Sequence, residues 1–375
     1  MPHPDKRGNG RVAISSWHYL PKMNVAAVIC FFVGAVACQV APAYAKVGFS
    51  VSGTTILAPN GSPFVMRGIN YAHSWFKNDA EVAIPAIAAT GANVIRIVLS
   101  DGGQYTEDKA ADVVRLLNLC EQNKLVAILE ASIIYIFLDT ELVTVFRTPL
   151  FGKGVRKVTV PTLETQVHDA TGSDDIGKLR RAANYWKNLA ETLKGREDRV
   201  IINIANEWFG SSGKSAQWAE GYMEVLPTLR WAGLEHLIVV DSPGWGQDAA
   251  AIAQEGIRIF EADPRRNTIF SIHMYEVAAP NAETVKRHID NSLAIGVPLI
   301  IGEFSDKQSK KDVDYKSIMK YCNERSVGWL AWSWHGNNID TKNMDISNKP
   351  STDLTPLGEE IVGHIKREAK IPNIW

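Results

Sequence analysis

Short apolar runs alternate with longer amphipathic stretches along most of this chain. The run from Arg199 to Trp208, Arg-Val-Ile-Ile-Asn-Ile-Ala-Asn-Glu-Trp, is almost wholly apolar until it stops at Asn206 and Glu207. Continuous apolar runs of this kind are typical of strands that a parallel sheet buries on both faces. The stretch 174–193 instead places its apolar residues on one helical face. The pattern therefore predicts strands and helices in alternation.

Counting the runs predicts eight strands, the number that a closed (β/α)8 TIM barrel requires. The predicted strands are 65–70, 93–99, a strand that begins at Leu125, 200–204, 237–241, 268–273, 298–303 and 328–334. The predicted helices are 79–90, 107–123, 174–193, 215–231, 282–295, 312–324 and 356–366. A short β-hairpin is predicted before the barrel, at 49–51 and 54–57. Because no linker-like tract or further repeat interrupts the alternation, we expect a single domain over 46–375.

Two of the predicted strands end in a glutamate. Glu207 follows the run 200–204, and Glu303 ends the run 298–303. One such residue could simply cap the next helix or meet a surface lysine. Two carboxylates at the carboxyl ends of barrel strands are instead the pair that glycoside hydrolysis requires, one to protonate the leaving oxygen and one to attack or stabilise the sugar cation.

These residues carry a resemblance to a known family. Asn206 and Glu207 on the fourth strand, His273-Met-Tyr275 on the sixth and Glu303 on the seventh resemble glycoside hydrolase family 5, a family of retaining (β/α)8 enzymes. The runs Asn203 to Trp208, Asp241 to Gln247 and Gly328 to Asn337 look most like the subfamily 8 endo-β-1,4-mannanases. The resemblance covers roughly residues 47 to 370, apart from one insert, and identifies 46–375 as a catalytic domain.

The resemblance implies a role for each of these side chains. Glu207 is expected to be the acid/base and Glu303 the nucleophile. Arg96 interrupts an apolar strand and needs a buried carboxylate partner, for which Glu303 is the candidate. Four further residues complete the expected set around the reacting sugar: Asn206 toward its 2-hydroxyl, Tyr275 toward Glu303, His273 toward Glu207, and His168 as the histidine of the third strand.

Several other side chains are candidates for binding substrate. Trp332 and Trp334 are expected to share one face of the eighth strand, because side chains alternate along a strand. Aromatic faces stack on pyranose rings, so one of the two is predicted to form the floor of the central subsite. The remaining candidates are Trp75, Trp208 and Trp245 as extensions of the cleft, and His73, Gln247 and Asn337 as polar contacts.

Charge and composition narrow the partners and the location. The 375 residues carry a formal net charge of −1, so no basic field favours nucleic acid. Four basic residues between positions 6 and 22 precede the apolar run 25–36, and Ala43-Tyr-Ala45 offers small residues before a cut at Lys46. This pattern predicts that 1–45 is a secretory signal peptide, rather than an uncleaved anchor or a lipoprotein signal ending at Cys38. We therefore expect a secreted extracellular monomer without stable membrane association.

No cofactor is expected, because the chain shows no phosphate-binding glycine loop and double displacement by two carboxylates needs no metal. Cys120 and Cys322 continue apolar helical stripes on the predicted second and seventh helices. Both should therefore be buried, and helices so far apart around a barrel do not allow a disulfide.

The segment 131–166 departs from the family pattern. In the family the third strand leads directly into the histidine, whereas here 131–166 stands between Glu130 and His168. Either 125–130 remains the strand and the insert loops out, or 157–166 replaces it, which Pro161 disfavours. We expect this insert to be foreign to the domain, for example a retained intron or a gene-model error.

The leading prediction is an endo-acting retaining β-mannanase that cleaves internal links of mannan, glucomannan or galactomannan. An endo-β-1,4-glucanase is the nearest alternative, since mannose and glucose differ only in the configuration of the 2-hydroxyl. The alternative from another class is an inactive carbohydrate-binding barrel that the insert 131–166 has disabled.

Overall fold

Eight parallel strands form the centre of the structure, a computed structural model that describes residues 48–103, 105–131, 171–308, 310–372, 374 and 375. The strands are β3 (Arg67–Tyr71), β4 (Val94–Leu99), β5 (Val126–Ala131), β6 (Val200–Asn203), β7 (Ile238–Asp241), β8 (Thr268–Met274), β9 (Leu299–Phe304) and β12 (Gly328–Ala331). They close in the order β12-β3-β4-β5-β6-β7-β8-β9. The predicted (β/α)8 barrel is therefore confirmed.

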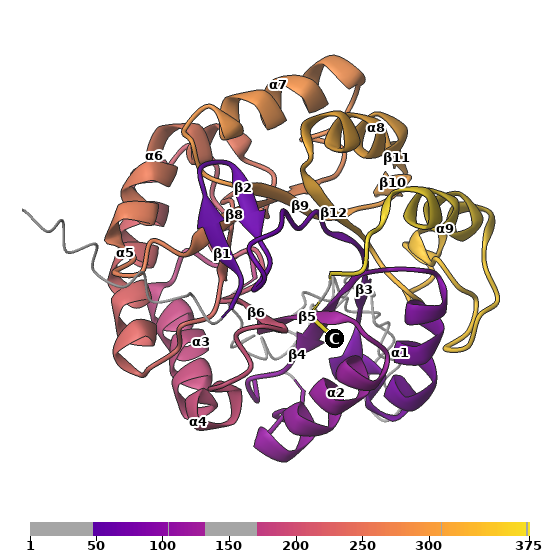
Figure 1. Cartoon of the computed structure of the whole chain (residues 1–375). Coiled ribbons are helices and arrows are strands. Elements are labelled where there is room, and N and C mark those ends of the chain that lie inside the picture. The colour runs from indigo at the N-terminus through magenta and orange to yellow at the C-terminus, as the bar shows by residue number, and fades with distance from the viewer. Residues whose placement is uncertain (1–47, 104, 132–170, 309, 373) are drawn as a thin grey trace, which may run out of the picture. The chain divides into compact units, whose positions relative to one another are not determined.

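Helices surround these strands (Figure 1). They are α1 (Ala80–Ala89), α2 (Ala110–Gln122), α3 (Ile176–Asn188), α4 (Ala190–Leu193), α5 (Ser215–Trp231), α6 (Ala249–Ala262), α7 (Ala282–Leu293), α8 (Tyr315–Arg325) and α9 (Pro356–Glu368), with short 3-10 turns at His73–Trp75, Lys77–Asp79 and Lys342–Met344. The helix predicted over 174–193 divides into α3 and α4. Helix α6 was not predicted, although Ala249, Ile252, Gly256 and Ile259 are buried at helical spacing.

Alternate side chains of each strand divide between two cores. In β4, Ile95 and Ile97 belong to the large cluster between strands and helices, whereas Val94 belongs to the cluster inside the barrel. Arg96 lies between these positions and therefore points inward. An apolar strand with one inward polar residue thus delivers that residue to the interior of the barrel.

A β-hairpin closes the end of the barrel at which the strands begin. It consists of β1 (Ser50–Ser52) and β2 (Thr55–Leu57), which pair antiparallel as predicted. Phe49 and Ile56 join the interior cluster beside Val94, and Phe49 N donates to Glu197 O just before β6. The opposite end, where the strands finish, remains for the polar side chains. A second small hairpin, β10 (Lys307–Gln308) with β11 (Lys311–Asp312), follows β9 at that end.

Strand β5 resolves the alternatives for the third barrel strand. Val126–Ala131 pairs with β4 along its whole length and with β6 through Ala127–Glu130. The alternative in which 157–166 replaces this strand is therefore wrong. Ala131, which the sequence assigned to the insert, is the buried last residue of β5. Residues 132–166 of the insert, His168 and the predicted signal peptide 1–45 lie outside the described residues.

The two cysteines of the described part of the chain are both buried and unpaired, Cys120 on α2 and Cys322 on α8. Their predicted burial is confirmed. None of the described helices combines the length and the apolar character that crossing a bilayer requires.

Candidate active site

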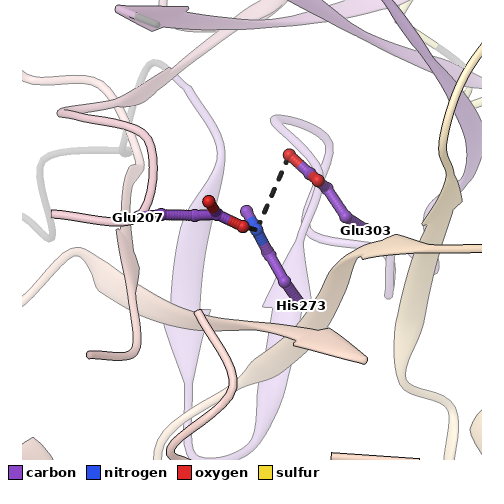
Figure 2. Close-up of side chains that lie close together, drawn as sticks. All are labelled: Glu207, His273 and Glu303. Atoms are coloured by element: carbon purple, nitrogen blue, oxygen red, sulfur yellow. Dashed lines mark hydrogen bonds and ion pairs between the residues drawn. The ribbon is translucent and has the colours of Figure 1, made fainter. Parts of the chain in front are cut away.

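Glu207, His273 and Glu303 converge at the carboxyl ends of three barrel strands. Glu207 follows β6, His273 belongs to β8 and Glu303 to β9. Figure 2 shows the imidazole of His273 between the two carboxylates. His273 Nδ1 lies 2.7 Å from Glu207 Oε1 and 3.6 Å from Glu303 Oε1. One oxygen of each glutamate lies within 4.8 Å of the other. The predicted proximity of His273 to Glu207 is confirmed.

Both oxygens of Glu303 are held from within the barrel. Arg96 Nη1 donates to Oε1 at 2.8 Å, and the Tyr275 hydroxyl donates to Oε2 at 2.8 Å. Both contacts were predicted from the sequence and are confirmed. A carboxylate bound at both oxygens by a guanidinium and a hydroxyl donor has a fixed orientation.

Arg96 is buried, and all three nitrogens of its guanidinium donate hydrogen bonds. It donates to Asn203 Oδ1 at 3.0 Å, to Asn70 Oδ1 at 2.9 Å and to Asn206 Oδ1 at 2.8 Å, besides Glu303. Its Nη2 also lies 3.7 Å from Glu130 and 3.8 Å from Asp241. The sequence predicted one carboxylate partner, whereas the structure has three. Burial alone lowers the pKa of Arg96, but Glu130, Glu303 and Asp241 outweigh it and raise that pKa.

The two sides of the cluster favour different protonation states. Burial raises the pKa of Glu207 to about 7, against the opposing hydrogen bond and charge of His273. Burial lowers the pKa of His273, but the charges of Glu303 and Asp241 outweigh it and raise that pKa well above its usual range. Glu207 can therefore hold a proton near neutral pH while Glu303 stays in its ion pair. This is the division that a general acid and a nucleophile require.

Glu130 belongs to the same cluster. It is the penultimate residue of β5 and is buried, and neither of its carboxyl oxygens has a hydrogen-bond partner among the described residues. Burial raises the pKa of Glu130 well above its usual range, and Arg96 only partly offsets this. Burial thus favours the protonated form of Glu130, whereas the charge of Arg96 favours its carboxylate.

Asn206 is oriented by its contacts on both sides. Its Oδ1 accepts from Arg96, and its Nδ2 donates to Thr171 Oγ1 at 3.3 Å. These contacts direct the amide so that the second hydrogen of Nδ2 remains for another acceptor. The predicted role, donation to a sugar 2-hydroxyl, requires this orientation.

An aromatic corner lies beside the end of β9, where Trp332 N donates to Phe304 O at 2.8 Å, one residue after Glu303. Trp332 and Trp75 are half-buried and meet edge to face with ring centroids 6.1 Å apart. Tyr105 meets the other side of Trp75 at 6.1 Å. Trp332 Nε1 donates to Asn337 Oδ1 at 3.1 Å, which fixes the indole. Trp245, 37% exposed, lies on the loop after β7. Trp332, Trp75 and Trp245 therefore remain candidate sugar platforms.

Three of the predicted substrate contacts are wrong, because these side chains are buried. Trp208 is 1% exposed, packs against Tyr222 and donates to Asp175 O. Trp334 is 0% exposed and donates to Pro350 O. The predicted strand alternation does not extend to it, because β12 ends at Ala331. The Trp332–Ser333 peptide is cis. His73 is buried 3.5 Å from Asp108.

The weaker polar candidates support loops. Gln247 Oε1 accepts from the backbone N–H groups of Val277 and Ala278. Asn337 binds Trp332, Ser333 and Asp345. His168 cannot be placed relative to the site, because it lies outside the described residues.

The chain matches a family model described as Cellulase (glycosyl hydrolase family 5) over residues 57–338. The chain belongs to glycosyl hydrolase family 5. It is 45% identical over 316 residues to "Mannan endo-1,4-beta-mannosidase" of Salipaludibacillus agaradhaerens, covering 84% of this chain and 91% of that protein. The solved β-mannanase of Thermomonospora fusca superposes with a TM-score of 0.72 at 32% identity, over 86% of this chain and 97% of that one. Its mannohexaose complex gives 0.71 at the same identity and coverage.

Four polar residues of this family 5 hydrolase were not recognised as site residues from the sequence. Asn70, Glu130, Asn203 and Asp241 all contact or face Arg96 inside the barrel. Each is a polar residue in or at the end of an otherwise apolar strand, which is the signal that identified Glu207 and Glu303. The same criterion, applied to every strand, would have found them.

The site also offers the atoms of a possible cation site. Among the described residues, ligand atoms of Glu207, His273 and Glu303 lie within 4.8 Å of one another. However, Arg96 and Tyr275 already bind both oxygens of Glu303, and His273 contacts Glu207 directly. These contacts already balance the charges of the three side chains. Glycoside hydrolysis by a pair of carboxyl groups does not need a metal ion.

Proposed function

We propose that this family 5 hydrolase is a secreted, monomeric endo-β-1,4-mannanase. It would cleave internal links of mannan, glucomannan or galactomannan with retention of configuration. The observation that carries the proposal is the short approach of Glu207 to Glu303, with one oxygen of each within 4.8 Å. Carboxyl groups of retaining glycosidases stand about 5–5.5 Å apart, whereas inverting pairs need about 6.5–9.5 Å to admit a water.

In the first step, Glu303 would attack the anomeric carbon while Glu207 donates its proton to the leaving sugar oxygen. Arg96 and Tyr275 orient the nucleophile, and the raised pKa of Glu207, about 7, keeps its proton available. The product of this step is a covalent glycosyl-enzyme at Glu303. In the second step, Glu207, now ionised, takes a proton from water, and the resulting attack releases the sugar with its original configuration.

The substrate assignment is supported by the names of the relatives. A mannan endo-1,4-β-mannosidase is 45% identical to this chain, and a β-mannanase that is 32% identical was solved with mannohexaose. Secretion is supported by the signal-like sequence before Lys46. An endoglucanase remains the alternative to test, because mannose and glucose differ only in the configuration of the 2-hydroxyl.

The test is hydrolysis of linear mannan by the purified protein, with Glu303→Ala as the blank. We expect reducing ends to appear with a rapid fall in viscosity, which marks internal cleavage, and no product from the variant. Proton NMR of the first product should show the β-anomer, whereas initial release of the α-anomer would contradict retention.

Carboxymethylcellulose provides the second arm. Faster hydrolysis of this polymer than of mannan would overturn the substrate assignment in favour of the glucanase. A folded protein that cleaves neither polymer would support the inactive barrel. A variant that lacks 132–166 separates two causes of that outcome, since restored activity would assign the loss to the insert.

A further inference from the structure

Asp241, the last residue of β7, joins the backbone of Glu207 to the ring of His273. Its Oδ2 accepts from Glu207 N at 3.0 Å and lies 3.6 Å from His273 Nε2. The side chain is completely buried. It therefore has no surface to offer a substrate and can act only through the residues that it contacts.

Glu207 needs such a contact because of its backbone conformation. Its φ is +45°, in the left-handed region that side-chain-bearing residues seldom adopt. Residues held in this region persist only where their surroundings determine the conformation. Two hydrogen bonds do so here, from Glu207 N to Asp241 Oδ2 and from Gly172 N to Glu207 O, each 3.0 Å long. The bond with Gly172 joins two backbone groups, so of these two bonds only the one to Asp241 involves a side chain.

Asp241 is itself rigidly held. Its Oδ1 accepts from Asn203 Nδ2 at 3.3 Å, and its carbonyl oxygen accepts from Trp218 Nε1 at 3.0 Å. The strand that carries it pairs with β8, where Asp241 lies opposite Ser271, two residues before His273. The carboxylate is therefore fixed relative to both of the residues that it joins.

His273 is held between two carboxylates. Nε2 faces Asp241 and Nδ1 faces Glu207 at 2.7 Å. The backbone of Gly246 lies against the ring so closely that a Cβ there would be 2.7 Å from His273 Cγ. The imidazole cannot tilt toward that side, and the charge of Asp241 keeps a proton on it that Nδ1 can donate to Glu207.

We propose that Asp241 is a positioning residue for the acid/base of this enzyme. It holds Glu207 in the left-handed conformation and holds His273 against the Glu207 carboxyl, so that the carboxyl proton is directed at the leaving oxygen. The inference rests on the proposed function, in which Glu207 is the acid/base. Asp241 also lies 3.8 Å from Arg96, but Arg96 binds Glu303 directly at 2.8 Å, so loss of Asp241 should act mainly on proton transfer.

The dependence of kcat/KM on the leaving group separates this positioning role from a general structural role. A sugar hydroxyl must be protonated as it leaves, whereas 2,4-dinitrophenolate leaves without a proton. The parameter to compare is kcat/KM, because it reports the steps up to formation of the glycosyl-enzyme and excludes the second step, in which Glu207 acts as a base. Linear mannan and 2,4-dinitrophenyl β-mannobioside are the two substrates.

Asp241→Asn is the test variant. The amide has the size of the carboxylate but only one acceptor oxygen, so it cannot accept from both Asn203 and Glu207, and it carries no charge. We expect kcat/KM on mannan to fall about 100-fold, the scale of positioned acid catalysis, and that on the dinitrophenyl substrate to fall less than about threefold. Equal losses on both substrates, or no loss on mannan, would overturn the inference.

Asp263→Asn is the matched control. Asp263 is also a buried aspartate in an ion pair, with Arg230 at 2.8 Å, but it lies before β8, at the opposite end of the barrel. The ratio of kcat/KM on the two substrates should be unchanged in this variant, because a partial loss of folded protein lowers both values equally.

A titration of the His273 ring by NMR provides a readout that needs no substrate. The charged and titratable groups that face or adjoin this ring are Glu207, Asp241, Glu303, Arg96, Glu130 and Tyr275. Removal of the Asp241 charge should lower the pKa of His273, and Asp241→Ala should accelerate hydrogen exchange of the Glu207 amide. If wild type cleaves neither substrate, the proposed function fails, and these two measurements alone decide the inference, with unchanged values overturning it.

Discussion

The Tyr275 hydroxyl donates to Glu303 Oε2 at 2.8 Å, on the oxygen that Arg96 does not use. The carboxylate of Glu303, the proposed nucleophile, is therefore held from two directions, by donors from β4 and from the residue after β8. Burial and the charge of Glu303 together raise the pKa of Tyr275 well above its usual range, so its proton stays available for this bond. The rotation of the carboxylate is thereby restricted before a substrate arrives, which lowers the cost of reaching the transition state.

Tyr275→Phe should lower kcat on mannan about 10- to 100-fold, because a hydrogen bond to a charged group contributes about 1.5–3 kcal/mol. Steady-state kinetics measures this loss. Tyr222→Phe is the matched control, since Tyr222 is also fully buried but its hydroxyl has no hydrogen-bond partner among the described residues. A similar loss in both variants would show that buried tyrosines act through packing alone.

The pH dependence should follow the acid/base. Glu207 acts as an acid only when protonated, and its pKa is raised to about 7 by burial. The value of kcat/KM on mannan should therefore fall as pH rises through about 7. His273 opposes the raised pKa through its hydrogen bond and its charge. His273→Gln removes that charge, so the pKa of Glu207 should rise and the alkaline limb should move to higher pH. A limb that stays in place or moves down would contradict the assignment.

The barrel could be predicted because its strands are continuous apolar runs. β6 and β9 are buried along their whole length, and their runs are apolar apart from Asn203 and Asn206 before each reaches its glutamate, so Glu207 and Glu303 were both identified. The polar residues that point into the barrel were harder to predict from the sequence. Asp241 ends an apolar strand and Glu130 lies one residue before the end of another, but the sequence does not show which strands bring such residues within reach of Arg96.

The aromatic residues show that strand alternation and position in the sequence did not predict every side-chain environment. Strand alternation placed Trp334 beside Trp332, but β12 ends at Ala331, so alternation applies to neither residue. Trp208 follows Glu207 directly, yet it packs into the core against Tyr222 rather than toward the cleft. The left-handed conformation of Glu207 redirects the chain at that point, and no residue type in the run signals it.

Trp332 and Trp334 should therefore differ sharply as alanine variants. Trp332→Ala removes a half-buried ring from the corner with Trp75, so kcat/KM on mannan should fall about tenfold or more, equivalent to about 1.4 kcal/mol. Trp334→Ala should instead lower the free energy of unfolding by about 3–5 kcal/mol, because it empties a fully buried site. Denaturant titration and steady-state kinetics on both variants measure the contrast. A purely kinetic effect of Trp334→Ala would contradict the burial argument.

The ion pair between Arg230 and Asp263 should stabilise the end of the barrel opposite the site. Arg230 donates from Nε and Nη2 to the two oxygens of Asp263 at 2.8 Å, and both side chains are almost completely buried. Removal of one partner leaves a buried charge unpaired, so Asp263→Asn should lower the free energy of unfolding by about 3 kcal/mol near neutral pH.

The same pair should make stability depend on pH in one direction. Burial raises the pKa of Asp263, but the hydrogen bonds from Arg230 outweigh it and hold that pKa below its usual range. A folded-state pKa below the unfolded value, about 3.9, means that the contribution is complete above that value and is lost as pH falls through the folded pKa. The difference in free energy of unfolding between wild type and Asp263→Asn should therefore be constant from pH 6 to about 5 and shrink below about pH 4. Urea titrations at each pH measure it, and a difference that grew on acidification would contradict the sign of the shift.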